Sequence, residues 1–270
     1  MDNRPIGVFD SGIGGLTAVR ALRELLPNES IVYFGDVARV PYGTRSRETI
    51  IKYTAQDIRF LFSHDVKMVI AACGTASSNF PSEQAKALTV PFTGVVLPAA
   101  QAACAATKTG KIGVIGTSAT IRSGAYGKAV RSVRADAVVM GNACPLFVPL
   151  VENGYTARDS AMTILAAKQY LAPFLGKVDT LILGCTHYSV ITEIIADIVG
   201  DSVTLIDAGA TAARHAQTLL TAGNLLADGE QQGEDSYFVS DSPEDFRENA
   251  RLYLGSDACG SVTQINIEDY

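Results

Sequence analysis

Short, unbroken apolar runs are the most regular feature of the chain. They lie at 6–9, 30–35, 67–72, 111–117 and 180–183. Runs of this length without polar alternation are typical of strands that are buried on both faces of a parallel sheet. Longer segments with the apolar spacing of helices separate them, so the pattern predicts an α/β fold. The clearest of these helical segments cover 16–26, 46–63 and 210–226.

The order of these elements is repeated along the chain. The run at 111–117 corresponds to the run at 6–9, and the offset is 106 residues from Ile31 to Ala137 and 112 residues from Met68 to Thr180. Chance similarity does not preserve an order of elements. The repeat therefore predicts two pseudo-symmetric α/β domains with mainly parallel sheets flanked by helices, and an active site in the interdomain cleft.

The two repeats do not divide the chain at a single point. We expect residues 1–97 and 208–270 to form the first domain and residues 98–207 to form the second, because the first repeat is too short to stand without the C-terminal segment. A serine cap followed by proline is a helix start signal in that segment. Its expected elements are a polar stretch at 227–235, a strand at 237–239, a helix that begins behind Ser242, and a strand at 262–267.

Two cysteines follow apolar runs that correspond in the repeat, Cys73 and Cys185. In open α/β sheets, ligands bind beyond the carboxyl ends of the strands, so we expect both thiols to face one cleft. The glycine-rich turn at 10–15 also follows a strand, and its backbone N–H groups would attract a carboxylate or a phosphate. Asp36 lies about twenty residues further on, as in a dinucleotide fingerprint, but the third glycine position is Thr17, so a small acid fits better than a nicotinamide.

Composition narrows the classes of function. A net charge of -6 and a pI near 5.1 argue against a nucleic-acid-binding surface. The chain shows no signal segment and no membrane-spanning run, so we expect a cytoplasmic protein. The cysteines have no paired spacing, which favours reduced thiols and gives no zinc motif. We expect plain packing roles for Cys104, Cys144, Cys259, His64 and His215.

Two thiols at one cleft suit several chemistries. They could form a disulfide switch, bind a metal, act as one nucleophile with a second thiol that is not used, or act as a pair of proton carriers. For a metal site, only His187 is a nearby additional ligand. Proton carriage across a planar carbon is the distinctive possibility, because one thiolate removes an α-proton while the opposite thiol supplies one to the other face. Backbone N–H groups after Asp10, Cys73 and Cys185 would hold the substrate charges.

Several motifs together carry a family resemblance. They are GVFDSGIGG at 7–15, YFGD at 33–36, PYG at 41–43, ACGTAS at 72–77, ACPLFVPLVE at 143–152 and GCTHY at 184–188. In these motifs the chain resembles glutamate racemase, a cofactor-independent family that supplies D-glutamate for peptidoglycan.

The resemblance implies roles for individual residues. Cys73 and Cys185 would be the acid/base pair, with Asp10 assisting the first and His187 the second. Asp36 and Glu152 would support the site. Glutamate would contact Asp10, Ser11, Tyr42, Gly43, Gly74, Thr75, Thr186 and His187. The resemblance further implies no cofactor, no metal and a homodimer, and some members of the family act on gyrase.

Simpler interpretations exist for the individual residues. Asp10 would cap a helix that begins near Ile13, Tyr42 would pack within its loop, and Glu152 would be a solvated charge. The fold and the thiol pair also leave open another amino acid or a hydantoin as substrate, or a glutamate-binding regulatory protein.

The chain departs from the family pattern at two positions. Gly74 stands where the family has Asn, and Ser189 stands where it has Pro. A lost hydrogen bond to a charged group is worth about 1.5–3 kcal/mol, so the missing amide is expected to lower activity by about ten- to hundredfold. Ser189 lies beyond the reacting groups and should matter less.

Overall fold

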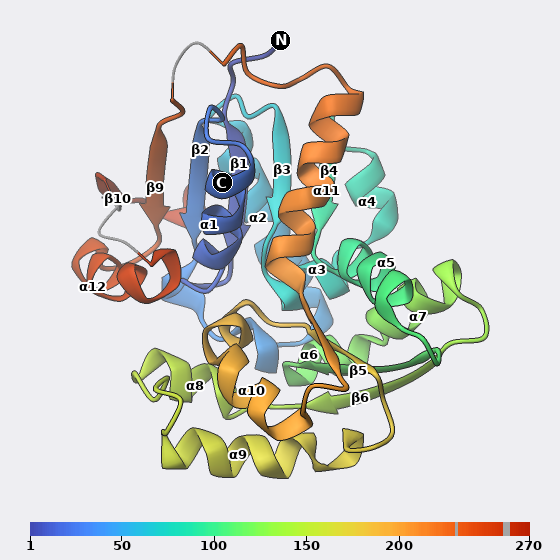
Figure 1. Cartoon of the computed structure of the whole chain (residues 1–270). Helices are drawn as coiled ribbons and strands as arrows, with labels where there is room; N and C mark the ends of the chain where they lie inside the picture. Colours follow the sequence, from blue (N-terminus) through green and yellow to red (C-terminus); the bar gives the residue numbers. More distant parts are fainter. Residues whose placement is uncertain (230–231, 256–259) are drawn as a thin grey trace.

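The structure is a computed structural model that describes residues 1–229, 232–255 and 260–270. Cys259 and part of the polar stretch at 227–235 lie outside the described residues. The chain folds into two lobes, each built around a parallel sheet, with helices on the outside (Figure 1). The α/β class predicted from the apolar runs is confirmed.

The larger sheet has six strands in the described part of the chain, and every described pair is parallel. Its order is β10-β9-β2-β1-β3-β4. The strands are β1 (Ile6–Asp10), β2 (Ile31–Gly35), β3 (Met68–Ala71), β4 (Phe92–Gly94), β9 (Asp235–Val239) and β10 (Val262–Gln264).

The smaller sheet has the order β6-β5-β7-β8, again with parallel pairing. This is the order of β2-β1-β3-β4 in the larger sheet, so the repeat predicted from the sequence is confirmed at the level of topology. The strands are β5 (Lys111–Gly116), β6 (Val138–Ala143), β7 (Thr180–Leu183) and β8 (Thr204–Asp207).

The helices agree with the sequence pattern in place but not always in length. The helix expected to run to 226 ends at Ala222, and the last expected strand ends at Gln264 and is followed by a 3-10 turn. The α-helices are α1 (Leu16–Leu25), α2 (Arg47–Phe62), α3 (Gly74–Asn79), α4 (Ser82–Lys86), α5 (Val96–Ala106), α6 (Ser118–Ser123), α7 (Ala125–Val133), α8 (Phe147–Glu152), α9 (Ala161–Leu171), α10 (Thr192–Val199), α11 (Ala208–Ala222) and α12 (Pro243–Leu254). The 3-10 helices are η1 (Val37–Arg39), η2 (Tyr42–Thr44), η3 (Ala172–Phe174), η4 (Thr186–Ile191) and η5 (Ile267–Asp269).

Alternate residues of the larger sheet enter different cores. Val8 belongs to the cluster that continues into the smaller lobe, whereas the next residue, Phe9, belongs to a cluster on the opposite face. Tyr33 and Phe34 on β2 divide in the same way. Both faces of the sheet are therefore covered, which is why its strands are continuously apolar.

Helix α11 returns the chain to the larger lobe. Asp207 caps it by accepting a hydrogen bond from Ala210 N at 2.9 Å, and the helix packs against α1, α5 and β4. Strands β9 and β10 then extend the larger sheet beside β2 (Figure 1). The domain boundaries at 97/98 and 207/208 stay a prediction. In the described residues, no helix combines the length and the apolar character needed to cross a bilayer.

Candidate active site

The turns that follow β3 and β7 carry the two cysteines and pack directly on each other. A Cβ atom added to Gly74 would overlap the carbonyl oxygen of Gly184 and lie 3.6 Å from the Cα atom of Cys185. A side chain at position 74 would hold the two backbones apart. Corresponding strands of the two sheets thus place Cys73 and Cys185 at one junction between the lobes.

A cavity of about 280 Å³ opens at this junction. Its size suits a molecule of about the size of an amino acid. Both lobes contribute to its wall, and both thiols face it. The residues predicted from the sequence that line it are Asp10, Ser11, Tyr42, Gly43, Cys73, Gly74, Thr75, Glu152, Cys185, Thr186 and His187.

Cys73 is held in a buried, hydrogen-bonded position. Its Sγ atom donates to Ser11 Oγ at 3.2 Å and accepts from Ala76 N at 3.4 Å. Burial, together with the nearby charge of Asp10, raises the pKa of the Cys73 thiol to about 12. At neutral pH Cys73 therefore carries its proton when the cavity holds no substrate.

Asp10 lies at the end of β1 and is 1% exposed. Its Oδ2 atom accepts a hydrogen bond from Gly15 N at 3.1 Å. Burial raises the pKa of Asp10, and the charge of His187 acts in the opposite direction. We expected Asp10 to cap a helix that begins near Ile13, and the start of this helix was wrong. Helix α1 begins at Leu16, and Asp10 accepts its hydrogen bond from Gly15, the residue just before the helix.

Cys185 belongs to a chain of polar contacts. Its Sγ atom lies 3.8 Å from His187 Nδ1, and His187 Nε2 lies 3.0 Å from Glu152 Oε1. Burial works against a charged imidazole, but the contacts with Cys185 and Glu152 prevail and raise the pKa of His187 to about 10. His187 is therefore an imidazolium at neutral pH, and its positive charge faces the sulfur. Glu152 is bonded to His187, so it is more than a solvated charge.

The loop with Tyr42 is held from behind by buried carboxylates. The Tyr42 hydroxyl donates to Asp36 Oδ2 and lies 3.1 Å from Asp57 Oδ2. Arg39 Nε donates to Asp36 Oδ2 at 2.6 Å, and Ser240 Oγ donates to Asp36 Oδ1 at 2.8 Å. Asp36 lies behind the loop and is not part of the cavity wall, and Tyr42 uses its hydroxyl for this cluster.

Sequence reasoning missed Thr117, which lines the cavity from the smaller lobe. Its Oγ1 atom lies 2.9 Å from Thr75 Oγ1, so a hydroxyl pair bridges the two lobes. Thr117 follows β5 as Ser11 follows β1, and this internal symmetry was the signal that could have identified it. Cys144 also lines the cavity, and burial raises the pKa of its thiol.

The other predicted packing residues lie away from the cavity. Cys104 Sγ donates to Val130 O at 3.7 Å, and His64 packs between the rings of Phe60 and Phe238. His215 Nδ1 lies 2.8 Å from Thr93 Oγ1. The cysteines at 73, 104, 144 and 185 are free thiols. In the described part of the chain, no group of three or more His, Cys, Asp or Glu side chains is arranged to hold a metal ion.

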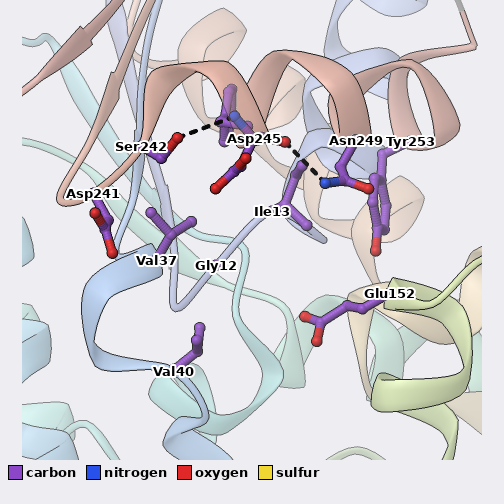
Figure 2. Close-up of a pocket in the computed structure, with 11 residues that line it drawn as sticks. Gly12, Ile13, Val37, Val40, Glu152, Asp241, Ser242, Asp245, Asn249 and Tyr253 are labelled. Carbon is purple, nitrogen blue, oxygen red and sulfur yellow. Dashed lines mark hydrogen bonds between the residues drawn. The ribbon is translucent and has the colours of Figure 1, made fainter.

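A second pocket of about 280 Å³ adjoins the cavity and shares Gly12, Val40 and Glu152 with it. Figure 2 shows Glu152 entering this pocket from α8, opposite Asn249 and Tyr253 of α12. The side chain of Glu152 is 39% exposed. Glu152 therefore stands between the interior of the active site and solvent.

Two α/β halves of one topology, each with a thiol at a shared cavity, indicate an isomerase of a two-domain class. The model of the Asp/Glu/Hydantoin racemase family matches residues 16–216, and the chain belongs to this family. The resemblance inferred from the motifs is thereby confirmed.

Relatives over nearly the whole chain are glutamate racemases. The enzyme of Geobacter metallireducens is 42% identical over 266 residues, with 98% of this chain and 97% of the relative covered. That of Chlorobaculum tepidum is 47% identical over 255 residues, with 94% and 93% covered. The solved glutamate racemase of Francisella tularensis in complex with D-glutamate has a TM-score of 0.91 at 39% identity, with 100% of both chains covered.

Proposed function

We propose that this protein interconverts L-glutamate and D-glutamate by a two-thiol acid/base mechanism, without a cofactor. The observation that carries the proposal is the cavity between the lobes, which is lined by free thiols from corresponding strand ends. The names of the relatives and the D-glutamate bound to the Francisella tularensis enzyme support glutamate as the substrate.

The two sulfur atoms differ in the charges around them. Cys73 is a thiol at neutral pH and lies near Asp10, whereas the imidazolium of His187 lies 3.8 Å from Cys185 Sγ. In one direction, Cys185 takes the α-proton, the electron pair of the C–H bond stays on the carbon, and Cys73 gives its proton to the opposite face. The other direction reverses these steps, and each turnover exchanges the roles of the thiols.

The surrounding groups stabilise the developing carbanion and hold the substrate. Hydroxyl groups of Ser11, Thr75, Thr117 and Thr186 line the cavity and suit carboxylate oxygens. Asp10 adjoins the Cys73 side, and His187 adjoins the Cys185 side. The amide missing at Gly74 would lower the activity.

The D-glutamate would serve peptidoglycan synthesis, the role that the family resemblance implies. The homodimer, the action on gyrase and the cytoplasmic location stay predictions.

A circular-dichroism assay tests the proposal, with L- and D-glutamate and L- and D-aspartate as substrates and no added cofactor. We expect inversion of both glutamate enantiomers and loss of inversion in Cys73→Ala and in Cys185→Ala. Cys104→Ala is the matched control, because that thiol lies outside the cavity. Full activity of either active-site variant would exclude the paired mechanism, and faster inversion of aspartate would reassign the substrate.

A further inference from the structure

The two thiols differ in their connection to solvent. From Cys185, the chain of contacts runs over 3.8 Å to His187 Nδ1, and from His187 Nε2 over 3.0 Å to Glu152 Oε1. Glu152 is 39% exposed and borders both the cavity and the pocket of Figure 2. A hydrogen-bonded path thus joins this sulfur to a partly exposed carboxyl group that also borders the second pocket.

Cys73 has no such path among the described residues. Its hydrogen-bonding partners are Ser11 Oγ, Ala76 N and the carboxyl group of Asp10. Ser11 lines the same cavity that a substrate fills, and the neighbouring Asp10 is 1% exposed and bonded to Gly15 N. An amino acid in the cavity would therefore separate Cys73 from water, whereas Cys185 would stay connected through its histidine.

The pocket on the far side of Glu152 suits water. Asp241 and Asp245 stand exposed at its rim, and Asn249 adds a further polar group (Figure 2). Tyr253 also lines it, and the Tyr253 hydroxyl is buried with no hydrogen-bond partner among the described residues. Buried polar atoms in folded proteins are almost always paired, so this hydroxyl indicates a small hydrogen-bonding molecule in the pocket, and water has the right size and chemistry.

We propose that the pocket of Figure 2 is a proton-exchange port for Cys185, which operates while substrate occupies the cavity. The inference rests on the proposed two-thiol function. The exchange uses the minor neutral form of His187, in which Nδ1 is unprotonated and the single ring proton is on Nε2. In this form, a proton taken from the α-carbon to Cys185 Sγ passes to Nδ1, as the proton on Nε2 moves to Glu152 and then to water. A solvent proton returns by the reverse route, so only bonds to hydrogen change. Glu152 is a positioning residue that acts through His187.

The proposal predicts an isotopic asymmetry between the enantiomers. Each protiated glutamate enantiomer is incubated with the enzyme in D₂O, and early in the reaction NMR measures deuterium at the α-carbon of the unconverted substrate and of the product. The enantiomer that gives its proton to Cys185 should gain deuterium before it inverts, because that proton exchanges and a deuteron returns. The enantiomer that gives its proton to Cys73 should keep its protium until it inverts.

Glu152→Gln tests the route itself. In this variant we compare the rate of deuterium uptake into the unconverted substrate with the rate of inversion. For the enantiomer that gives its proton to Cys185, this ratio should fall to the value measured for the other enantiomer. A purely structural role for Glu152 would slow exchange and inversion together and leave their ratio unchanged. Asp241→Asn is the matched control, since it removes a carboxylate from the same pocket without a bond to His187, and its isotope pattern should equal that of the wild type.

The outcomes separate the two proposals. A wild-type protein that inverts neither glutamate enantiomer would contradict the proposed function. Inversion with equal deuterium uptake by both unconverted enantiomers, or an unchanged ratio in Glu152→Gln, would overturn the exchange port alone. The comparison of the wild-type enantiomers needs no variant, so it decides the matter even where Glu152→Gln does not fold.

Discussion

Gly74 shows how one missing side chain affects both substrate contact and the fit of the lobes. From the sequence, Gly74 is only a lost amide donor. In the structure, the bare Cα atom also lets the Cys73 turn lie against Gly184 and Cys185. An added Cβ atom would push these backbones apart. An asparagine at position 74 would therefore have two opposite effects on activity, because its amide would raise the activity and its Cβ atom would lower it.

Two substitutions separate these effects. Gly74→Ala adds only the Cβ atom, and we expect kcat/KM to fall by as much as about a hundredfold, because small displacements of reacting groups are costly. Gly74→Asn restores the amide, whose hydrogen bond is worth about 1.5–3 kcal/mol. Its kcat/KM should therefore exceed that of Gly74→Ala by about ten- to hundredfold. Equal rates for the two variants in the circular-dichroism assay would show that the amide contributes nothing.

His187 is the residue whose charge state governs the Cys185 side. Its pKa is raised to about 10, so the imidazolium and its effect on the sulfur persist through neutral pH and are lost as the pH rises through that value. Glu152 is one of the causes of the raised pKa. Removing the charge of Glu152 therefore lowers the pKa of His187, and the imidazolium is lost at a lower pH.

The pH dependence of kcat/KM gives a direct test. We expect activity in the wild type to decline on the alkaline side near pH 10, and the decline in Glu152→Gln to begin at lower pH. An ¹⁵N NMR titration of the His187 ring measures the same pKa without turnover. Suppose that Glu152→Gln lowers the pKa of the His187 ring but leaves the alkaline decline of kcat/KM at the same pH. This result would show that the charge of His187 is not needed for the reaction.

At the scale of elements, strand ends supply the chemistry and a buried cluster holds the loop beside it. β1, β3, β5 and β7 end at the cavity with Asp10, Cys73, Thr117 and Cys185 at or just beyond their last residues. η2 forms a further wall, and Arg39, Asp36 and Asp57 anchor it from behind. Burial, aided by the charge of Asp36, raises the pKa of Asp57, whose Oδ2 atom lies 3.1 Å from the Tyr42 hydroxyl.

Arg39 is the cation that this cluster requires. Its side chain is 10% exposed, and it contacts the fully buried carboxyl groups of Asp36 and Asp57. Arg39→Met leaves a buried carboxylate uncompensated, and we expect a loss of about 3–5 kcal/mol in the free energy of unfolding, measured with urea.

The control for this prediction is Arg158→Met, which removes the exposed ion pair with Asp197 and should change stability little. Asp57→Asn keeps a polar group of the same shape at this position and leaves no additional buried charge, so it should cost less than Arg39→Met. An Arg39→Met protein as stable as the wild type would show that the carboxylates do not depend on this cation.

At the scale of the whole molecule, the site exists only where the lobes meet. The Thr75–Thr117 hydroxyl pair spans the junction, and Gly43 lies against the side chain of Thr117. Gly14, in the turn before α1, lies against Thr186 and His187 of the other lobe. Backbone without side chains thus brings the lobes close enough to surround one small substrate.

Gly14→Ala tests this closeness. Its Cβ atom would overlap Thr186 Oγ1 and lie 2.6 Å from His187 Nδ1, so the histidine turn must move. We expect kcat/KM to fall by about a hundredfold with the fold retained. Gly141→Ala is the control, because its Cβ atom meets Ile121 at an ordinary 3.5 Å. Wild-type kinetics in Gly14→Ala would show that the junction tolerates a wider gap.

The sequence by itself determined the class of fold, the internal repeat and the two strand-end cysteines, because apolar runs and motif spacing are local properties of the chain. The family motifs also contain most of the residues that line the cavity, but not Val40, Thr44, Thr117 and Ser118. Tertiary structure decided what depends on distance between the lobes: the closeness of Gly74 to Gly184, the Thr75–Thr117 bridge and the route from Cys185 to Glu152. These contacts join segments that are remote in sequence, and only packing of the two lobes brings them within bonding distance.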